Sequence, residues 1–435
     1  MGSKEGLGVS VVNFDLLLNK ELFASEISSA HKCNKELSYS CYQNATILPC
    51  CQLPNGQSGG GVLSADGQLL TESTVHKGSH VPYDVDAEEV EEADETVLYF
   101  GMLIGIWGHC ITDCIKRAWF FQCDDYKSKY ANLKIVYTAH EGSLHQNFLE
   151  LLNCLGIDIH SFTEIKKPTR FKQIIIPDSS FFLDDSRIEQ YTKEYRETID
   201  RIKLTVQYEC DNNFKKIYYS HRNVRGINND IGEEKLEKYF RQQGFEIVHP
   251  ERLSFKQQLE LLSRCTVFAA SDGSTSHNSI FLPEDAEVII IPRSPYLTFH
   301  QLALNELYEE QKIYYIDATL SILCKGDRPT RGPFFYYVSP NLIEHIENRR
   351  FEENDHWVKD NFKDFERYLR RGFYIENNRT FTAKSPYTEL SMYYFNKYLF
   401  LKKPRKILVS TGRKIDYFIS RFAKKIIRLF QSIAK

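Results

Sequence analysis

The chain has 435 residues, of which 42% are hydrophobic and 26% charged, with a formal net charge of -3. This length favours two lobes over one core, and this composition is typical of a soluble protein with a sizeable hydrophobic core. Residues 401–435 carry eleven Lys or Arg and one acid, Asp416, so the rest of the chain holds about -13. An acidic body argues against a broad nucleic-acid-binding surface, because phosphate contacts require basic grooves.

The cysteines and the start of the chain predict a reducing, cytoplasmic setting. Eleven Cys are scattered without CxxC pairs, which argues against zinc. No charged-then-apolar signal segment opens the sequence. No apolar run is long enough to span a bilayer, so we expect at most peripheral contact with the inner face of the plasma membrane.

The first 95 residues favour a region rich in β-strands and loops. Residues 52–68 are rich in Gly, Asn and Ser, which is typical of tight turns. The acidic run from Asp86 to Glu95 is typical of a solvated linker. We expect residues 1–95 to pack on the first lobe.

Alternating strand and helix patterns predict a first α/β lobe over residues 96–207. The expected elements are a strand at 96–100, a helix at 110–122, a strand at 134–137, a helix at 144–154, a strand at 173–176 and a helix at 186–205.

The same alternation predicts a second lobe over residues 208–330, with a parallel sheet. The expected strands are 216–220, 246–248, 267–271, 288–291 and 313–316, and the expected helices are 233–243, 255–263 with a Ser254–Gln257 capping box, a short one to 282, and 301–311. Ligands bind beyond the carboxyl ends of such strands, which singles out the loops after Ser220, Ser271 and Ile291. Residues 331–400 are expected to form a helical segment that returns to the first lobe.

The segment Trp107-Gly108-His109 opens a predicted helix and is followed by Asp113. His109 and Asp113 are four residues apart and share one helix face. Either side chain can act as a general base, and the carboxylate can hold the imidazole in one tautomer. The alternative is a surface pair between Asp113 and Arg117, with His109 as a helix cap.

Two loops of the second lobe could bind an anion. Arg222 and Arg225 follow the strand that ends at Ser220, and their guanidinium groups suit a diphosphate. The other loop follows Ser271 and leads into a short helix, where backbone N–H groups and small polar side chains suit phosphate or sugar. The residues concerned are Gly273, Ser274, Thr275, His277 and Asn278. No metal constellation is evident, since Asp124-Asp125 follows a helix rather than a strand.

Taken in order from about Gly60 to Asp317, these motifs resemble glycosyltransferase family 61, especially its bacterial capsule and cell-surface polysaccharide members. The residues that carry the resemblance are Gly60-Gly61-Val62, Asp66-Gly67, Trp107-Gly108-His109 with Asp113, Ser220-His221-Arg222, the segment 244–251 (GFEIVHPE) and the loop ending in His277-Asn278. Where many relatives have Gly-x-Gly in that loop, this chain has Asp272-Gly273-Ser274.

The resemblance implies a GT-B-like pair of Rossmann-type lobes and sugar transfer with inversion from a nucleotide-sugar donor, without an obligatory metal or other cofactor. It implies a glycan or lipid-linked glycan acceptor in surface polysaccharide synthesis. Asp113 is then the first choice of base with His109 assisting, while Ser220, Arg222, Arg225 and the 273–278 loop hold the donor diphosphate.

The pattern of residues 401–435 predicts a basic amphipathic helix, because apolar side chains recur at helical spacing with Lys or Arg between them. Its expected partner is an anionic membrane surface, and the alternative is packing on the acidic body or on a partner protein. Two other functions remain open at this point: a nucleotide-sugar-binding or scaffold protein without catalysis, and a hydrolase that uses Asp113 and His109. The sequence leaves the oligomeric state open.

Overall fold

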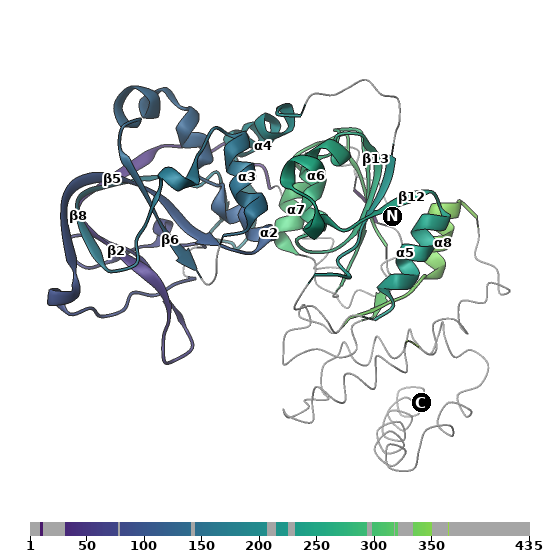
Figure 1. Cartoon of the computed structure of the whole chain (residues 1–435), viewed down its shortest axis with the longest axis horizontal. Helices are drawn as coiled ribbons and strands as arrows, with labels where there is room; N and C mark the ends of the chain where they lie inside the picture. Colours follow the sequence, from purple (N-terminus) through teal and green to yellow (C-terminus); the bar gives the residue numbers. More distant parts are fainter. Residues whose placement is uncertain are drawn as a thin grey trace, which may run out of the picture.

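The computed structural model describes residues 9–11, 31–76, 79–140, 144–206, 215–224, 231–293, 298–316, 318–320, 334–349 and 364. Two lobes lie side by side, each built on its own β-sheet, with helices α3, α4, α6 and α7 between the sheets (Figure 1). The chain is therefore a mixed α/β protein. Arg225 and the 401–435 tail lie outside the described residues.

The first lobe contains a mixed seven-stranded sheet rather than a purely parallel one. Strands β5, β6, β7 and β8 pair in parallel, whereas β2, β3 and β4 add an antiparallel half through β8. In sheet order the strands are β4 (Leu69–Leu70), β3 (Ser58–Leu63), β2 (Tyr39–Gln52), β8 (Thr169–Pro177), β5 (Glu91–Ile104), β6 (Lys134–His140) and β7 (Thr163–Glu164). The N-terminal region thus supplies strands to this sheet instead of only packing on it.

The acidic run before Thr96 is part of central strand β5, so the linker prediction was wrong for its second half. Basic residues on the neighbouring strands and loops pair with its carboxylates across the sheet. The pairs are Glu91 with Lys167, Glu92 with Arg170, Asp94 with Lys172 and Glu95 with Lys134. Cross-strand charge pairs of this kind favour the strand conformation for residues with low strand propensity.

The second lobe has a parallel six-stranded sheet, as the alternating pattern predicted. Its strands in sheet order are β1 (Val9–Val11), β15 (Lys312–Tyr315), β14 (Glu287–Ile291), β13 (Cys265–Ser271), β11 (Lys215–Tyr219) and β12 (Phe245–Val248). From β11 to β15 the order is 2-1-3-4-5, which makes the gap between β11 and β13 a topological switch point. Strand β1 belongs to this lobe, so the start of the chain does not lie wholly with the first.

The helices are short. They are α2 (Trp107–His109), α3 (Gln146–Cys154), α4 (Lys193–Leu204), α5 (Glu233–Gln242), α6 (Phe255–Leu262), α7 (Phe299–Asn305) and α8 (Pro340–Glu347), with the 3-10 segment η8 (Ser276–Phe281). The capping box at Ser254 and Gln257 is present at the start of α6. Two short hairpins complete the description: β9 (Phe181–Leu183) with β10 (Glu189–Tyr191), and β16 (Thr319–Leu320) with β17 (Phe335–Tyr336). Within the described residues, no helix is both long and apolar enough to cross a membrane.

One hydrophobic core runs through both lobes. Phe148 and Leu152 of α3 belong to the same buried cluster as Phe255 and Leu259 of α6. The backbone N–H of Phe255 also donates to the Glu150 carboxylate (2.8 Å). Because the buried core continues across the lobe interface, it holds the loops of the two lobes at fixed positions relative to each other.

The described part of the 331–400 segment packs on the second lobe, not on the first. Phe334 and Tyr336 of the β17 region and Leu342 of α8 share a buried cluster with Tyr218 and Phe240. Their apolar side chains cover the face of the parallel sheet opposite α6 and α7. The prediction of a return to the first lobe therefore fails for residues 334–349.

The predicted helix from Cys110 to Gln122 is broken into a π-helical turn at Cys110–Cys114 and a 3-10 segment at Ala118–Gln122. Arg117 lies between them and is fully buried. Its guanidinium donates to the carbonyls of Pro177 (2.9 Å), Phe100 (3.5 Å) and Glu72. Arg117 therefore ties the helix to the sheet and forms no surface pair with Asp113.

We expect Arg117→Met to lower the free energy of unfolding by about 3 kcal/mol or more, because it leaves buried carbonyls without their donor. Urea unfolding followed by circular dichroism measures the change. The matched control is Arg201→Met, on the exposed face of α4, which should shift the value by less than about 0.5 kcal/mol. Equal effects in the two variants would contradict the anchoring role.

Candidate functional site

His109 and Asp113 form a hydrogen-bonded pair at the lobe interface. The Nδ1–H of His109 donates to Asp113 Oδ2 (2.6 Å), as their four-residue spacing predicted. Asp113 is almost completely buried, with 2% of its side chain exposed, whereas the His109 side chain is 34% exposed. Because Nδ1 carries the proton, the lone pair of a neutral His109 ring lies on Nε2. The exposed partner of the pair is thus the imidazole.

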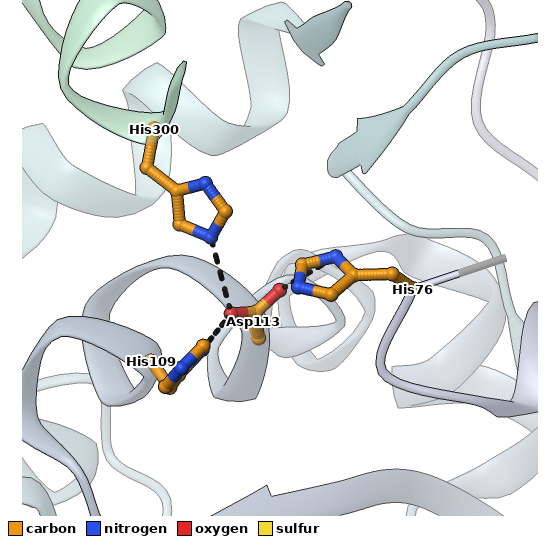
Figure 2. Close-up of side chains that lie close together, drawn as sticks. All are labelled: His76, His109, Asp113 and His300. Atoms are coloured by element: carbon orange, nitrogen blue, oxygen red, sulfur yellow. Dashed lines mark hydrogen bonds and ion pairs between the residues drawn. The ribbon is translucent and has the colours of Figure 1, made fainter. Parts of the chain in front are cut away.

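Two further histidines converge on the same carboxylate (Figure 2). His76 Nδ1 lies 3.4 Å from Asp113 Oδ1, and His300 Nε2 lies 3.7 Å from Asp113 Oδ2. His76 comes from the loop after Ser73 in the first lobe, whereas His300 is on α7 of the second. Three imidazoles from three separate segments therefore surround one buried carboxylate.

The surrounding donors keep Asp113 ionised. Burial acts to raise the pKa of its carboxyl, but hydrogen bonds from His109 and His300 and the charge of His76 hold that pKa well below its ordinary value. The Thr112 hydroxyl lies 3.0 Å from the same Oδ2. A carboxylate with a low pKa and this many partners is a weak base and a strong orienting group.

His300 links Asp113 to a second buried carboxylate. Its Nδ1 lies 3.0 Å from Glu189 Oε1, on β10 of the first lobe. Burial opposes the charged ring, but its hydrogen bonds to the two carboxylates raise the pKa of His300 to about 10. In this arrangement His300 is a cation at neutral pH, and it joins the two lobes electrostatically.

The loop that carries His76 is held by buried polar groups. Lys116 Nζ donates to the carbonyls of Thr74 (3.2 Å) and Val75 (2.5 Å), and the Thr74 hydroxyl donates to the His76 carbonyl (2.7 Å). Further along, the Ser79 hydroxyl lies 2.9 Å from Nδ1 of buried His80. His76 is therefore positioned by its own loop and by the helix segment that also carries Asp113.

The predicted small-residue loop meets the Trp107-Gly108-His109 motif directly. Trp107 Nε1–H donates to Asn278 Oδ1 (3.1 Å), and the Gly108 N–H donates to Ser274 Oγ (3.2 Å). A Cβ at Gly108 would lie 2.8 Å from Ser274 Oγ, so the glycine permits this close approach. Two of the predicted donor-binding side chains thus join the lobes beside His109.

His277 of the same loop is buried and points its Nδ1–H at Gln301 Oε1 (2.8 Å). Burial lowers its pKa to about 3, so the ring is neutral. Thr275 donates to the Ser271 carbonyl (2.8 Å) and is buried as well. Both side chains therefore stabilise the conformation of the loop rather than offer their polar atoms to a ligand.

At the switch point, the residues after β11 form a buried network. Ser220 donates its hydroxyl to Glu233 (3.1 Å) or Glu237 (2.9 Å), so this predicted donor-binding side chain turns inward. His221 Nδ1 lies 3.3 Å from Glu233 Oε2. Arg222 is half exposed and bonds Glu237 through one nitrogen (3.2 Å). Part of the Arg222 charge is therefore already compensated.

Arg293, two residues after β14, supplies a further cation that the sequence reading did not single out. Its Nη1 donates to Nε2 of neutral-tautomer His221 (3.3 Å), and the guanidinium packs over the Phe334 ring at 5.2 Å. Within the described residues it makes no ion pair with a carboxylate. A Cβ at Gly273, whose φ is +115°, would lie 2.2 Å from Arg293 Nη2, so only glycine fits beside it.

Asp272 does not face this cation as a free acid. It is buried, and its Oδ2 accepts a hydrogen bond from the Thr298 hydroxyl (2.7 Å). Burial raises the pKa of Asp272, and the charge of Arg293 opposes that rise. Asp272 is thus folded back towards Thr298, away from solvent.

Four ligand-capable side chains meet at Asp113. One ligand atom from each of His76, His109, Asp113 and His300 lies within 4.8 Å of the others (Figure 2). Sequence reasoning found only His109 and Asp113 of this cluster, because the other two members lie at positions 76 and 300, far from them in the chain. The Asp124-Asp125 pair, considered above as a metal candidate, is not part of this cluster. Asp125 bonds Tyr39 (2.9 Å) and Lys129 (2.9 Å).

The site is thus a facing pair of α/β lobes, with an oriented imidazole on one side and two arginines beyond the carboxyl ends of strands β11 and β14 on the other. The family model for glycosyltransferase 61 matches residues 107–289. These residues form a glycosyltransferase family 61 domain, and the chain is a glycosyltransferase. The matched stretch includes His109, Asp113 and the 271–278 loop.

Among solved structures, the chain is similar to dodecameric iron-containing heptosyltransferase TibC in complex with ADP-D-beta-D-heptose. The identity is 12%, and the match covers 80% of this chain and 96% of that one, with a TM-score of 0.26. A superposition this loose carries no argument about site or substrate. No curated protein sequence matches the chain.

The site residues that sequence reasoning missed are His76, Glu189, Arg293 and His300. Arg293 follows the carboxyl end of a predicted strand, a position already marked as worth inspection, and that signal could have found it. The other three carry no local signal, because only tertiary packing brings them to Asp113.

Acid should weaken the fold through buried His80. Burial lowers its pKa to about 4, below the ordinary 6.5, so the unfolded chain takes up a proton that the folded chain does not. Stability is therefore present above pH 6.5 and lost as the pH falls towards 4, by about 1 kcal/mol after solvent screening.

Urea unfolding at pH 7 and at pH 4.5 measures the total loss, and His80→Gln should reduce it by about 1 kcal/mol. Buried His277, whose pKa is also lowered, should account for part of the remainder. His160→Gln, at an exposed histidine of the same lobe, should keep the wild-type loss. A His80→Gln protein with the same acid loss as wild type would contradict the assignment.

Proposed function

We propose that the chain is an inverting glycosyltransferase with a GT-B-like pair of lobes, in which a nucleotide-sugar donor lies between the switch point of the second lobe and His109. The observation that carries the proposal is the contact between the two predicted motifs, Gly108 N–H to Ser274 Oγ (3.2 Å). This contact places the exposed imidazole next to the loop that borders the arginines. An acceptor hydroxyl and a donor sugar could then meet at one point.

In this proposal His109 is the general base and Asp113 its positioning residue, the reverse of the preference from sequence. Inverting transfer needs a group that accepts the proton of the attacking acceptor hydroxyl. Nε2 of His109 carries the free lone pair, and Asp113 fixes this tautomer and stabilises the imidazolium that forms. Asp113 itself is buried and has no exposed oxygen to offer a hydroxyl.

The donor diphosphate is proposed to lie against Arg293, with Arg222 as a second contact. The Arg293 guanidinium donates to His221 Nε2 rather than to a carboxylate among the described residues, so its charge is available to a phosphate. A planar guanidinium can bind phosphate oxygens in bidentate fashion and so stabilise the leaving nucleotide. No metal is required in this scheme, since the two arginines and His300 supply positive charge.

A glycan or lipid-linked acceptor, a role in surface polysaccharide synthesis, a cytoplasmic setting and a membrane contact by residues 401–435 stay predictions from the sequence. A panel of nucleotide-sugars tested by thermal shift would identify the donor, because a bound ligand stabilises the folded state. Absence of any shift would count against the transferase proposal in favour of a scaffold.

With the donor known, His109→Ala should lower kcat about 10²- to 10⁴-fold, since it removes the base, while the KM for the donor changes little. Added imidazole should restore part of the activity. Asp113→Asn should also lower kcat, but imidazole should not rescue it, because the native ring is still present. Nucleotide release coupled to a dye assay measures both variants.

His160→Ala serves as the control and should behave as wild type. Full activity in His109→Ala would remove it as base. Release of free sugar at the same rate without acceptor would point to a hydrolase instead.

Arg293→Ala should weaken donor binding about 10- to 100-fold, because it removes charge-assisted hydrogen bonds worth about 1.5–3 kcal/mol. Isothermal titration with the donor nucleotide measures the loss. Arg241→Ala, at an exposed position in the last turn of α5, is the matched control and should bind like wild type. Unchanged donor binding in Arg293→Ala would show that the diphosphate does not lie against Arg293.

A further inference from the structure

We propose that His76, His109, Asp113 and His300 form a binding site for one divalent transition-metal ion of the Zn²⁺ class, and that an ion bound there inhibits sugar transfer. Metal binding depends only on the four side chains and their geometry. The inhibition rests on the proposed role of His109 as base.

The spacing of the donor atoms fits a tetrahedral ion. Zn–N bonds of 2.0–2.1 Å in a tetrahedron place neighbouring ligand atoms about 3.3–3.4 Å apart. Here Asp113 Oδ1 lies 3.4 Å from His76 Nδ1, and Asp113 Oδ2 lies 3.7 Å from His300 Nε2. One ligand atom from each of the four residues lies within 4.8 Å of the others, so the ion would draw the outer ligands inward on binding. His109 Nδ1 is closer, at 2.6 Å from Oδ2. An ion would open that contact by less than 1 Å once it replaced the shared proton.

The surroundings supply the outer support that metal-bound histidines use. The second ring nitrogen of such a histidine is commonly bonded to a carboxylate, which fixes the ring and raises its basicity. Glu189 does this for His300, with Oε1 3.0 Å from Nδ1. Glu189 is itself buried, and among the described residues its Oε2 has no hydrogen-bond partner. The Thr112 hydroxyl supports Asp113 in the same way, 3.0 Å from Oδ2.

The donor set selects the class of ion. Three imidazoles and one carboxylate suit Zn²⁺, Co²⁺ or Ni²⁺, whereas Mg²⁺ and Ca²⁺ prefer oxygen ligands. Asp113 and Glu189 together carry two negative charges beside the proposed ion. Binding releases the proton that the charged His300 ring holds on Nε2, towards Asp113. The proton of the neutral His109 ring is not released but moves from Nδ1 to Nε2.

The same geometry explains why the ion inhibits. A metal on Nδ1 of His109 forces the ring proton onto Nε2, so Nε2 can no longer accept the proton of the acceptor hydroxyl. The ion also withdraws Asp113 from its role as partner of the imidazole. Because His76 and His109 belong to one lobe and His300 to the other, the ion would in addition link the lobes across the site (Figure 2).

Cobalt titration of the full chain, freed of metal with a chelator, tests the binding step. We expect one tightly bound Co²⁺ with the visible spectrum of a tetrahedral site, displaced by Zn²⁺. The spectrum should lack a thiolate-to-metal charge-transfer band, which separates this site from the cysteines. Failure to bind, or a spectrum with thiolate ligation alone, would overturn the proposal.

Variants locate the site. His76→Asn and His300→Asn should each abolish the tetrahedral spectrum, and Glu189→Gln should weaken Co²⁺ binding about 10- to 100-fold. His160→Asn, an exposed histidine away from the cluster, should leave binding unchanged. Circular dichroism checks that each variant is folded. Wild-type affinity in folded His76→Asn and His300→Asn would refute the assignment even if the protein binds Co²⁺.

Transfer activity separates the inhibition from the proposed function. Equimolar Zn²⁺ should suppress nucleotide release at least about tenfold, and chelator should restore it. Activity that is unchanged with the site filled would overturn the inhibition and also the role of His109 as base. Activity found only with the ion present would overturn the inhibition and the metal-independent mechanism, while the binding site itself would stand.

Discussion

The structure depends on one buried carboxylate. Removing Asp113 from water costs several kcal/mol unless donors replace the lost hydration. His109 supplies one hydrogen bond from the neighbouring helical turn, but His76 and His300 come from other segments and from both lobes. The charge therefore has its full set of partners only when the two lobes are in contact and the 74–76 loop is in place. Compensation of the Asp113 charge and closure of the lobe interface are therefore coupled.

The remaining architecture can be understood as support for that contact. Arg117 fixes the helical turn that carries Asp113 to the sheet, and Lys116 fixes the loop that carries His76. On the other side, the parallel sheet places the loops after β11, β13 and β14 at one edge. Gly108 lets the first lobe approach Ser274 of the second lobe without a Cβ in the way, and Gly273 lets the 271–278 loop approach Arg293 of its own lobe. The core that runs through α3 and α6 holds both sides in this register.

The sequence predicts the parts of this arrangement that depend on residues close together in the chain, and it misses the parts that depend on residues far apart. Strands β11 to β15 of the second lobe were predicted, because they are buried runs separated by helices, and the capping box at Ser254 is a local signal. Strand β1 and the β17–α8 region of the same lobe were not predicted there. The His109–Asp113 bond was predicted for the same reason, since four residues span one helical turn. The acidic start of β5 was misread, because the lysines and arginines that stabilise it lie on other strands. His76, His300 and Glu189 could not be found, because no pattern within their own segments marks them; only the folded chain brings them to Asp113.

The proposed base and the proposed metal site both depend on the protons that the histidines share with Asp113. Three imidazoles around one carboxylate can be satisfied by shared protons, as in the hydrogen bond from His109, or by one ion that all four groups bind. In the first state the His109 ring keeps its proton on Nδ1 and leaves Nε2 free to act. In the second state the ion takes Nδ1 and the proton moves to Nε2. The two states use the same side chains in nearly the same positions, so small changes in metal concentration could decide between an active and an inactive site without any change of fold. A site with one histidine would not have this property, because only the convergence of His76 and His300 on Asp113 gives an ion enough ligands to compete with the protons.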